Sequence, residues 1–143
     1  MQIQPCHRNF KMPEYGSVDA AAFDLFMPES GSCNSERTTI VSLGFKAAVP
    51  EGCMAILVPR SGVGFKHGVE LNNTVGVIDA DYRGEWFAAL RMKPNANQQQ
   101  LSWEVGDRLL QVAIVPIRRV NLQPVTELPI TDRNEGGLGS TGK

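Results

Sequence analysis

The sequence predicts an all-β fold with at most one short helix, and three observations support this prediction. Short stretches rich in β-branched and aromatic residues recur along the chain. Clusters of Gly, Pro, Asn and Asp separate these stretches, as expected of turns. No amphipathic stretch is long enough to form a helix of useful length. Several short strands at this spacing are typical of a β-barrel or a β-sandwich.

Each predicted strand has its own pattern. The first, 38–43, alternates polar and apolar residues, and the second, 53–58, is an apolar run ended by Pro59. The third and fourth, 74–79 and 85–92, flank a polar turn. The fifth is β-branched and ends near Pro116, and a single helical turn is expected at 61–68. Asp107 and Arg108 are expected to form a turn with a local ion pair. The predicted strands are 38–43, 53–58, 74–79, 85–92 and 108–117, and the predicted loops are 27–36, 49–52, 93–100 and 104–107.

Size and composition fit an ordinary globular protein. The chain has 143 residues, of which 42% are hydrophobic and 20% are charged. This length is enough for one domain with a real core and too short for two domains. The formal net charge of −1 argues against a general nucleic-acid binder, which usually carries a basic surplus. It leaves room for a local basic site that takes a small anion.

The cysteines and the N-terminus indicate a reducing compartment. Cys6, Cys33 and Cys53 are widely spaced and form no CxxC motif, which disfavours a zinc site and favours free thiols. The first residues are polar and lack the apolar core of a signal peptide. No apolar stretch approaches the roughly 18 residues that a membrane span requires. We expect a cytoplasmic protein, in the host cytoplasm if the source is a virus, with no membrane partner.

The C-terminal end differs from the rest of the chain. Residues 133–143, RNEGGLGSTGK, are rich in glycine and have almost no core-forming side chains. We therefore predict a single β domain over 1–132 and a flexible arm over 133–143. The glycine spacing is compatible with a phosphate-binding loop, but it lacks the GxxxxGK[ST] pattern of a P-loop. Taken alone, a mobile tail is the simpler interpretation.

Residues 73–85, NTVGVIDADYRGE, combine two carboxylates and a phenol in a strand–turn–strand segment. Asp79 and Asp81 occupy alternate positions, so they face the same side if the extended backbone continues through both. Tyr82 follows directly. We expect one carboxylate to act as a base and the other to pair with Arg83, or a turn to separate them. This hairpin is the strongest candidate for a binding or catalytic site.

Three further signals are weak when taken singly. Arg60 and Ser61, in the motif PRSG, offer donors suited to phosphate, but the motif alone is more often a surface turn. Gln111 interrupts an apolar run, where a polar amide usually faces solvent or binds the backbone. Asp24 lies among apolar neighbours and needs a partner or a nearby cation. A structural acid is the simpler interpretation of Asp24.

The order of these motifs is far more specific than any one of them. AxDL is followed by PRSGxGxKHG, NxxGxIDxDYRGE, GDRxxQ and RxxGGxGSTG. This ordered set resembles the trimeric dUTPase family over residues 20–143. The resemblance implies a distorted jelly-roll-like β-barrel of the β-clip type and a homotrimer whose active sites are shared between subunits. It also implies Mg²⁺-dependent hydrolysis of dUTP to dUMP and pyrophosphate, which keeps uracil out of DNA and supplies dUMP for dTMP synthesis.

The resemblance also implies roles for residues of the hairpin. Asp79 matches the carboxylate that activates the water attacking the α-phosphorus. Tyr82 matches the aromatic residue that packs on the deoxyribose and excludes a 2′-hydroxyl. Asn73 matches the polar residue of a uracil pocket that also excludes the methyl group of thymine. The backbone groups expected to read the base edge belong to Gly76, Val77 and Ile78.

Other motifs match phosphate-binding, metal-binding and closing positions of the family. Asp24 matches the acid that holds Mg²⁺ through bound water. The phosphate-contacting positions correspond to Arg60, Ser61, Gly62 and Gln111. Arg133 matches the arginine that closes on the γ-phosphate, and the same arm contributes Gly137, Leu138, Gly139, Ser140 and Thr141.

The sequence departs from the family pattern at three positions. Leu138 replaces the aromatic residue that stacks over uracil, and we expect weaker closure with the reaction intact. Replacing Leu138 with Phe is therefore expected to lower KM for dUTP, and an unchanged KM would contradict this expectation. Asn134 replaces a glycine, but Asn tolerates left-handed backbone angles. Ala22 replaces a glycine close to Asp24.

Two other functions remain as alternatives. A dCTP deaminase shares the fold and the trimer, but it needs a glutamate at the position that Ala89 occupies here. A nucleotide-switched interaction module on the same scaffold is the second alternative, with 27–37 and 93–100 available to a partner. The expected partners are dUTP, dUMP, pyrophosphate and two further copies of the chain.

Overall fold

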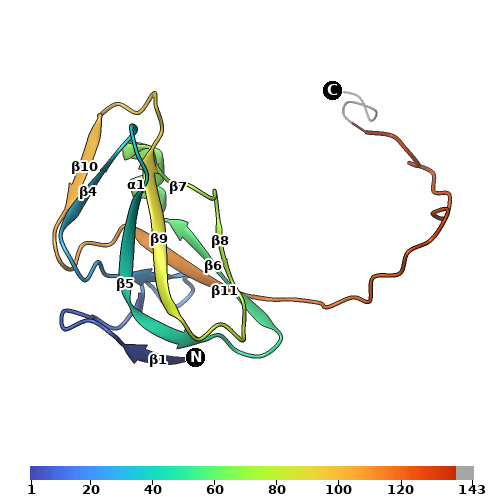
Figure 1. Cartoon of the computed structure of the whole chain (residues 1–143), viewed down its shortest axis with the longest axis horizontal. Coiled ribbons are helices and arrows are strands. Elements are labelled where there is room, and N and C mark those ends of the chain that lie inside the picture. Colours follow the sequence, from blue (N-terminus) through green and yellow to red (C-terminus); the bar gives the residue numbers. More distant parts are fainter. Residues whose placement is uncertain (138–143) are drawn as a thin grey trace.

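The structure is a computed structural model that describes residues 1–137, and its regular secondary structure within them is almost entirely β-strand (Figure 1). One short helix, α1 (Ser61–His67), lies where the sequence predicted a helical turn. The all-β prediction with at most one short helix is therefore confirmed for these residues. The strands are β1 (Gln2–Pro5), β2 (Glu14–Tyr15), β3 (Phe23–Leu25), β4 (Gly31–Asn34), β5 (Thr39–Ala48), β6 (Cys53–Pro59), β7 (Val69–Leu71), β8 (Gly76–Ile78), β9 (Glu85–Met92), β10 (Gln100–Trp103) and β11 (Leu110–Pro116).

The strands form sheets whose neighbours are mostly not consecutive in sequence. One sheet has the order β1-β5-β9-β7, a second has the order β2-β3-β11-β6-β8, and β10 pairs with β4. The pairs within these sheets are antiparallel. Long crossovers between sheets are the mark of a jelly-roll-like fold, as predicted. This topology brings β3 and β6, far apart in sequence, to either side of β11.

The core follows from the alternation of side chains along the strands. Along β9, Trp86, Ala88, Leu90 and Met92 are buried, whereas Phe87 is exposed. Alternate residues of a strand face opposite sides, so one apolar face enters the core and the other does not. The Trp86 ring packs against that of Phe45 with 5.0 Å between ring centroids.

The sequence pattern predicted none of β1, β2, β3 and β7, and it also missed the β4–β10 pair. Both strands lie within or beside segments predicted as loops, 27–36 and 93–100, because their residues are few and largely polar. The pair is held by Trp103, whose ring lies against Gly31 where a side chain would collide with it. Cys33 is buried in the same pair, and burial raises the pKa of its thiol to about 11.

After β11 the chain leaves the folded body. Residues 117–137 form an extended segment without strand or helix, which is still tied to the body at Ile117, whose N–H donates to Gly52 O at 2.8 Å, and then runs away from the sheets (Figure 1). Its apolar side chains are exposed in this single chain, including Leu122 at 92% and Ile130 at 88%. Within the described part of the chain, no helix is long and apolar enough to cross a membrane.

Candidate active site

The hairpin between β8 and β9 presents the predicted carboxylates. Asp79 directly follows β8, is exposed, and accepts a hydrogen bond on its backbone oxygen from Tyr82 N at 3.2 Å. The Tyr82 hydroxyl donates to the Glu85 carbonyl at 3.1 Å. A Cβ atom at Gly84 would overlap the Tyr82 ring. Glycine at position 84 therefore lets the ring lie flat against the hairpin.

The end of this hairpin is fixed by β5. The Ser42 hydroxyl donates to the Glu85 carboxylate and accepts a hydrogen bond from Gly44 N at 2.9 Å. The register between β5 and β9 shifts between Ser42 and Lys46, where Gly44 has a φ of 75°. A bulge at this place lets the Ser42 side chain reach the Glu85 carboxylate. The backbone carbonyl of Glu85 accepts the hydrogen bond from the Tyr82 hydroxyl.

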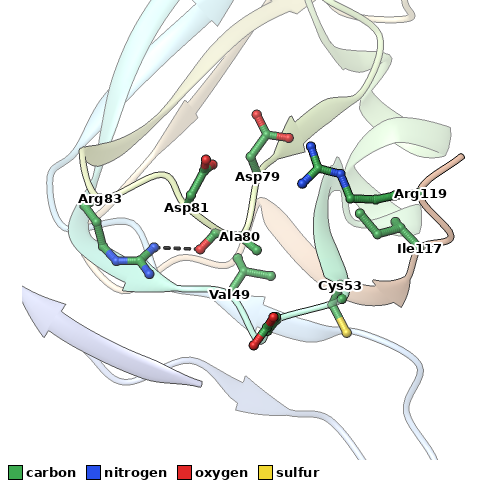
Figure 2. A pocket seen from close by; sticks show the side chains of 10 residues that line it. Val49, Cys53, Asp79, Ala80, Asp81, Arg83, Ile117 and Arg119 are labelled. Carbon is green, nitrogen blue, oxygen red and sulfur yellow. Dashed lines mark hydrogen bonds between the residues drawn. The ribbon is translucent and has the colours of Figure 1, made fainter. Parts of the chain in front are cut away.

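A cavity of about 770 Å³ lies beside the hairpin, and we call it the hairpin pocket (Figure 2). Asp79 and Asp81 lie on one wall, and Figure 2 shows the Arg119 guanidinium pointing toward Asp79. The pocket is lined by Val49, Glu51, Gly52, Cys53, Asp79, Ala80, Asp81, Arg83, Ile117 and Arg119.

The expected ion pair between Asp81 and Arg83 does not form. Arg83 Nη1 instead donates to the carbonyl oxygens of Ala80 at 2.7 Å and Tyr82 at 2.9 Å. The guanidinium therefore closes its own turn, because the turn carbonyls lie nearer to it than the carboxylate does. Arg83 acts as a structural residue of the hairpin.

The start of the hairpin contains a strained turn at Thr74. Its φ of 67° is unusual for a β-branched residue. Thr74 N donates to Leu71 O at 2.8 Å, and Val75 N donates to Asn73 O at 2.7 Å. These bonds hold Asn73 exposed at the tip that precedes β8. Gly76 lies tight against the core, where a Cβ atom would be 3.0 Å from that of Leu57.

Asp24 is the buried charged residue of the described chain, at 7% exposure, and two arginines neutralise it. Arg60 Nε lies 2.9 Å from its Oδ1 and Arg108 Nη1 lies 3.2 Å from its Oδ2. Arg60 also donates from Nη1 to the Arg108 carbonyl at 3.1 Å. The prediction of an ion pair between Asp107 and Arg108 is wrong. Arg108 pairs with Asp24, and the Asp107 carboxylate accepts a hydrogen bond from Glu104 N at 2.8 Å.

Strand pairing brings the other predicted phosphate-binding residues beside Asp24. Gln111 on β11 is the direct partner of Asp24 on β3. Its Nε2 donates to the Pro59 carbonyl at 3.3 Å, and Arg60 N donates to Leu109 O at 2.8 Å. The exit of β6 is thus tied to β11, and Ser61 and Gly62 begin α1 at the same place.

These side chains line a second cavity, of about 400 Å³, which we call the Asp24 pocket. It contains five of the predicted site residues: Asp24, Arg60, Ser61, Gly62 and Gln111. Sequence reasoning missed Lys66 and His67, although the motif PRSGxGxKHG included them. The remaining lining residues are Gly16, Ala20, Ala22 and Val63.

The other predicted site residues do not join the Asp24 pocket within one chain. Asp79 lines only the hairpin pocket, and the two pockets share no residue. Arg133 lies on the extended segment, where its Nε donates to Gly136 O at 2.9 Å. Asn134 has a φ of 40°, in the left-handed region that Asn tolerates. The predictions for Leu138, Gly139, Ser140 and Thr141 concern positions outside the described residues.

The donor set allows a metal ion only through water. Residues 1–137 contain no group of three or more His, Cys, Asp or Glu side chains placed to hold a metal. Both oxygens of Asp24 already face guanidinium groups. Mg²⁺ retains several waters and binds through one or two carboxylates together with substrate phosphates. A hydrated ion beside Asp24 fits this arrangement, whereas a cage of protein ligands does not.

A jelly-roll-like fold, a cationic pocket around a buried acid, and a hairpin with an exposed carboxylate define a class of β-rich nucleotide hydrolases. The chain belongs to the dUTPase family, whose model matches residues 8–142. It is similar to deoxyuridine 5′-triphosphate nucleotidohydrolases from Syntrophotalea carbinolica and Clostridium tetani. The first is 40% identical, covering 99% of this chain and 96% of the relative, and the second is 36% identical, covering 100% and 97%.

Solved structures share the fold. A dUTPase of Staphylococcus bacteriophage 80alpha with dUPNHPP superimposes with a TM-score of 0.87 at 24% identity, covering 99% of this chain and 98% of that one. The D95N mutant dUTPase of phage phi11, described as coordinating a structural Mg(II) ion, gives a TM-score of 0.76 at 24% identity. The match covers 88% of this chain and 96% of that one.

Proposed function

We propose that this chain is a dUTP diphosphatase, which hydrolyses dUTP to dUMP and pyrophosphate by water attack on the α-phosphorus. The observation that carries the proposal is the Asp24 pocket. Three separate segments bring Asp24, Arg60 and Gln111, each matched to a different family motif, into one cavity. In the cytoplasm, this activity keeps uracil out of DNA and supplies dUMP for dTMP synthesis.

The hairpin supplies the base and the nucleoside filter. Asp79 takes a proton from the attacking water. The water oxygen bonds to the α-phosphorus, and pyrophosphate leaves with the electrons of the broken P–O bond. Tyr82, fixed on Gly84 and by its bond to Glu85, packs on the deoxyribose and leaves no room for a 2′-hydroxyl. Asn73 binds the uracil edge.

The backbone of β8, which leads into the hairpin, completes base recognition. The extended groups of β8, at Gly76, Val77 and Ile78, lie next to Asn73 and read the edge of uracil. Because Gly76 packs closely on Leu57, β8 has no space to move toward the core and make room for a larger base. A thymine methyl group is therefore excluded.

The Asp24 pocket binds the phosphate chain. Arg60 contributes a guanidinium, Ser61 and Gly62 contribute donors at the start of α1, and Gln111 contributes an amide. Asp24 would hold Mg²⁺ through bound water, and the ion would supply positive charge that offsets the charge of the triphosphate. Because Arg60 is ion-paired with Asp24, its guanidinium is pre-oriented for the phosphates.

We further propose a homotrimer in which each active site draws on different subunits. The base and the phosphate-binding residues of one chain lie in pockets that share no residue, so one chain alone does not assemble a complete site. The extended segment after β11 exposes apolar side chains suited to covering another subunit. It would carry the arm at 133–143, with Arg133, Leu138, Gly139 and Ser140, to a neighbouring nucleotide, while 1–132 remains the β domain.

Pyrophosphate release from dUTP, dTTP, UTP and dCTP, with and without Mg²⁺, tests this function. We expect strong preference for dUTP and a large loss of rate when Mg²⁺ is removed. Equal release from UTP or dTTP would contradict the proposed nucleoside filter. Release of ammonia from dCTP would instead indicate a deaminase.

A further inference from the structure

The C-terminal end of α1 is held by the loop that follows β9. Lys93 N donates to Gly68 O at 2.8 Å, and His67 Nδ1 lies 3.3 Å from Gln98 Oε1. Gly68 has a φ of 69°, and a Cβ atom there would lie 2.8 Å from that of Ala96. Three separate contacts thus join this loop to the last turn of the helix. From sequence, 93–100 was predicted as a loop and as a segment available to a partner, with no link to the helical turn.

The same turn of α1 forms part of the Asp24 pocket. Lys66 and His67 line the pocket together with Arg60. His67 is half-buried, and Lys66 makes no ion pair with any residue of the described chain. Both side chains are therefore available to a ligand of the pocket.

The charge of the pocket makes these two side chains relevant to a triphosphate. Asp24 offsets much of the positive charge that Arg60 and Arg108 supply, since each of its oxygens faces one guanidinium. A triphosphate carries several negative charges, and further donors on the same wall strengthen its binding. Lys66 and His67 are the other basic side chains that line this cavity.

The contact with Gln98 leaves one imidazole nitrogen of His67 for a ligand. If Gln98 accepts a proton from Nδ1 of an imidazolium ring, Nε2–H remains as a donor. If the amide is turned over and donates to Nδ1 of the neutral ring, the tautomer again carries its proton on Nε2. In both of these arrangements Nε2 carries a proton and points away from Gln98. A neutral ring with its proton on Nδ1, donating to Gln98 Oε1, would leave Nε2 as an acceptor, so a bound phosphate selects the two arrangements in which Nε2 is the donor.

We propose that His67, positioned by Gln98, is a further ligand of the β- and γ-phosphates in the Asp24 pocket. This inference rests on the proposed function and extends it, because it assigns a role to the loop at 93–100. Lys66 adds charge on the same wall without a fixed geometry. Gln98 is a positioning residue that acts only through the imidazole ring.

Binding of α,β-imido-dUTP and of dUMP to purified variants, measured by calorimetry with Mg²⁺, tests this proposal. dUMP lacks the β- and γ-phosphates, so it reports base and sugar binding alone. His67→Asn keeps a hydrogen-bonding group near the position of Nδ1 and loses the donor at the position of Nε2. We expect roughly tenfold weaker binding of α,β-imido-dUTP to this variant with unchanged dUMP binding, as for the loss of a hydrogen bond to a charged group. His67→Gln, which retains a donor near Nε2, should recover part of the loss.

Gln98→Leu and Gln99→Leu form a matched pair in the same loop. We expect Gln98→Leu to weaken binding of the triphosphate analogue about threefold, as for a modest hydrogen bond, and Gln99→Leu to leave it unchanged. An unchanged ratio of the two affinities in both His67→Asn and Gln98→Leu would overturn the proposal. Wild-type protein that binds neither nucleotide would overturn the proposed function itself.

Discussion

Within the hairpin, two aspartates that look equivalent in sequence have different surroundings. Asp79 directly follows β8, and Tyr82 N donates a hydrogen bond to its carbonyl, so the proposed base and the proposed sugar filter are tied together by one hydrogen bond. Asp81 lies further around the turn and makes no ion pair with Arg83. The proposed roles therefore separate the two carboxylates.

Asp79→Asn should reduce pyrophosphate release from dUTP by roughly 10²- to 10⁴-fold, because an amide cannot accept the proton of the attacking water. Binding of α,β-imido-dUTP should persist. Asp81→Asn is the matched control, and its rate should remain within a few fold of wild type. Near-normal turnover by Asp79→Asn would show that another group is the base.

Gly84→Ala should impair discrimination against UTP. The added Cβ atom occupies space now filled by the Tyr82 ring, so the ring must move away from the position proposed to block a 2′-hydroxyl. We expect the ratio of kcat/KM for dUTP to that for UTP to fall roughly tenfold, the effect of a modest pocket change. Unchanged selectivity, with the fold intact by circular dichroism, would contradict the proposed role of Tyr82.

At the scale of elements, periodicity predicted the long apolar strands and failed for the short polar ones. β6 and β9 begin where the sequence predicted, because their apolar and alternating residues both form strands and fill the core. β4 and β10 were missed because Gly31, Trp103 and their neighbours pair through a contact between distant segments.

In the site, too, some features were predicted from sequence and others became clear only from the fold. Motif order identified Asp24, Arg60 and Gln111 as parts of one site, and the structure places them in one pocket. No local pattern indicated that Arg108 pairs with Asp24, because strand pairing brings together residues far apart in sequence. The contact between His67 and Gln98 depends on the path of a loop and was equally hidden.

The buried face of β9 provides a test of the core. Trp86 is 2% exposed, and its Nε1–H finds no partner within the described chain. Trp86→Ala should lower the free energy of unfolding by about 3–5 kcal/mol through cavity formation. Trp86→Phe should cost clearly less, about 1–2 kcal/mol, since the aromatic ring leaves a smaller cavity and no hydrogen bond is lost. Urea unfolding measures both, and equal losses would contradict the role of ring packing at this position.

At the scale of the whole molecule, the separation of the two pockets is the central feature. Each chain offers the proposed base in the hairpin pocket and the proposed phosphate-binding residues in the Asp24 pocket, together with an extended segment that exposes apolar side chains. Under the proposed assembly, a single copy is incomplete as an enzyme. In the proposed trimer, the parts of three copies complete one another.

Complementation between inactive variants tests this claim most directly. Asp79→Asn and Arg60→Ala chains are each expected to be inactive, and co-refolding them gives mixed trimers. An interface that pairs the intact hairpin of one chain with the intact Asp24 pocket of another should then recover pyrophosphate release from dUTP. Recovery on mixing is the predicted result. Mixed trimers, verified by differential tags, that remain as inactive as the separate variants would contradict the shared site.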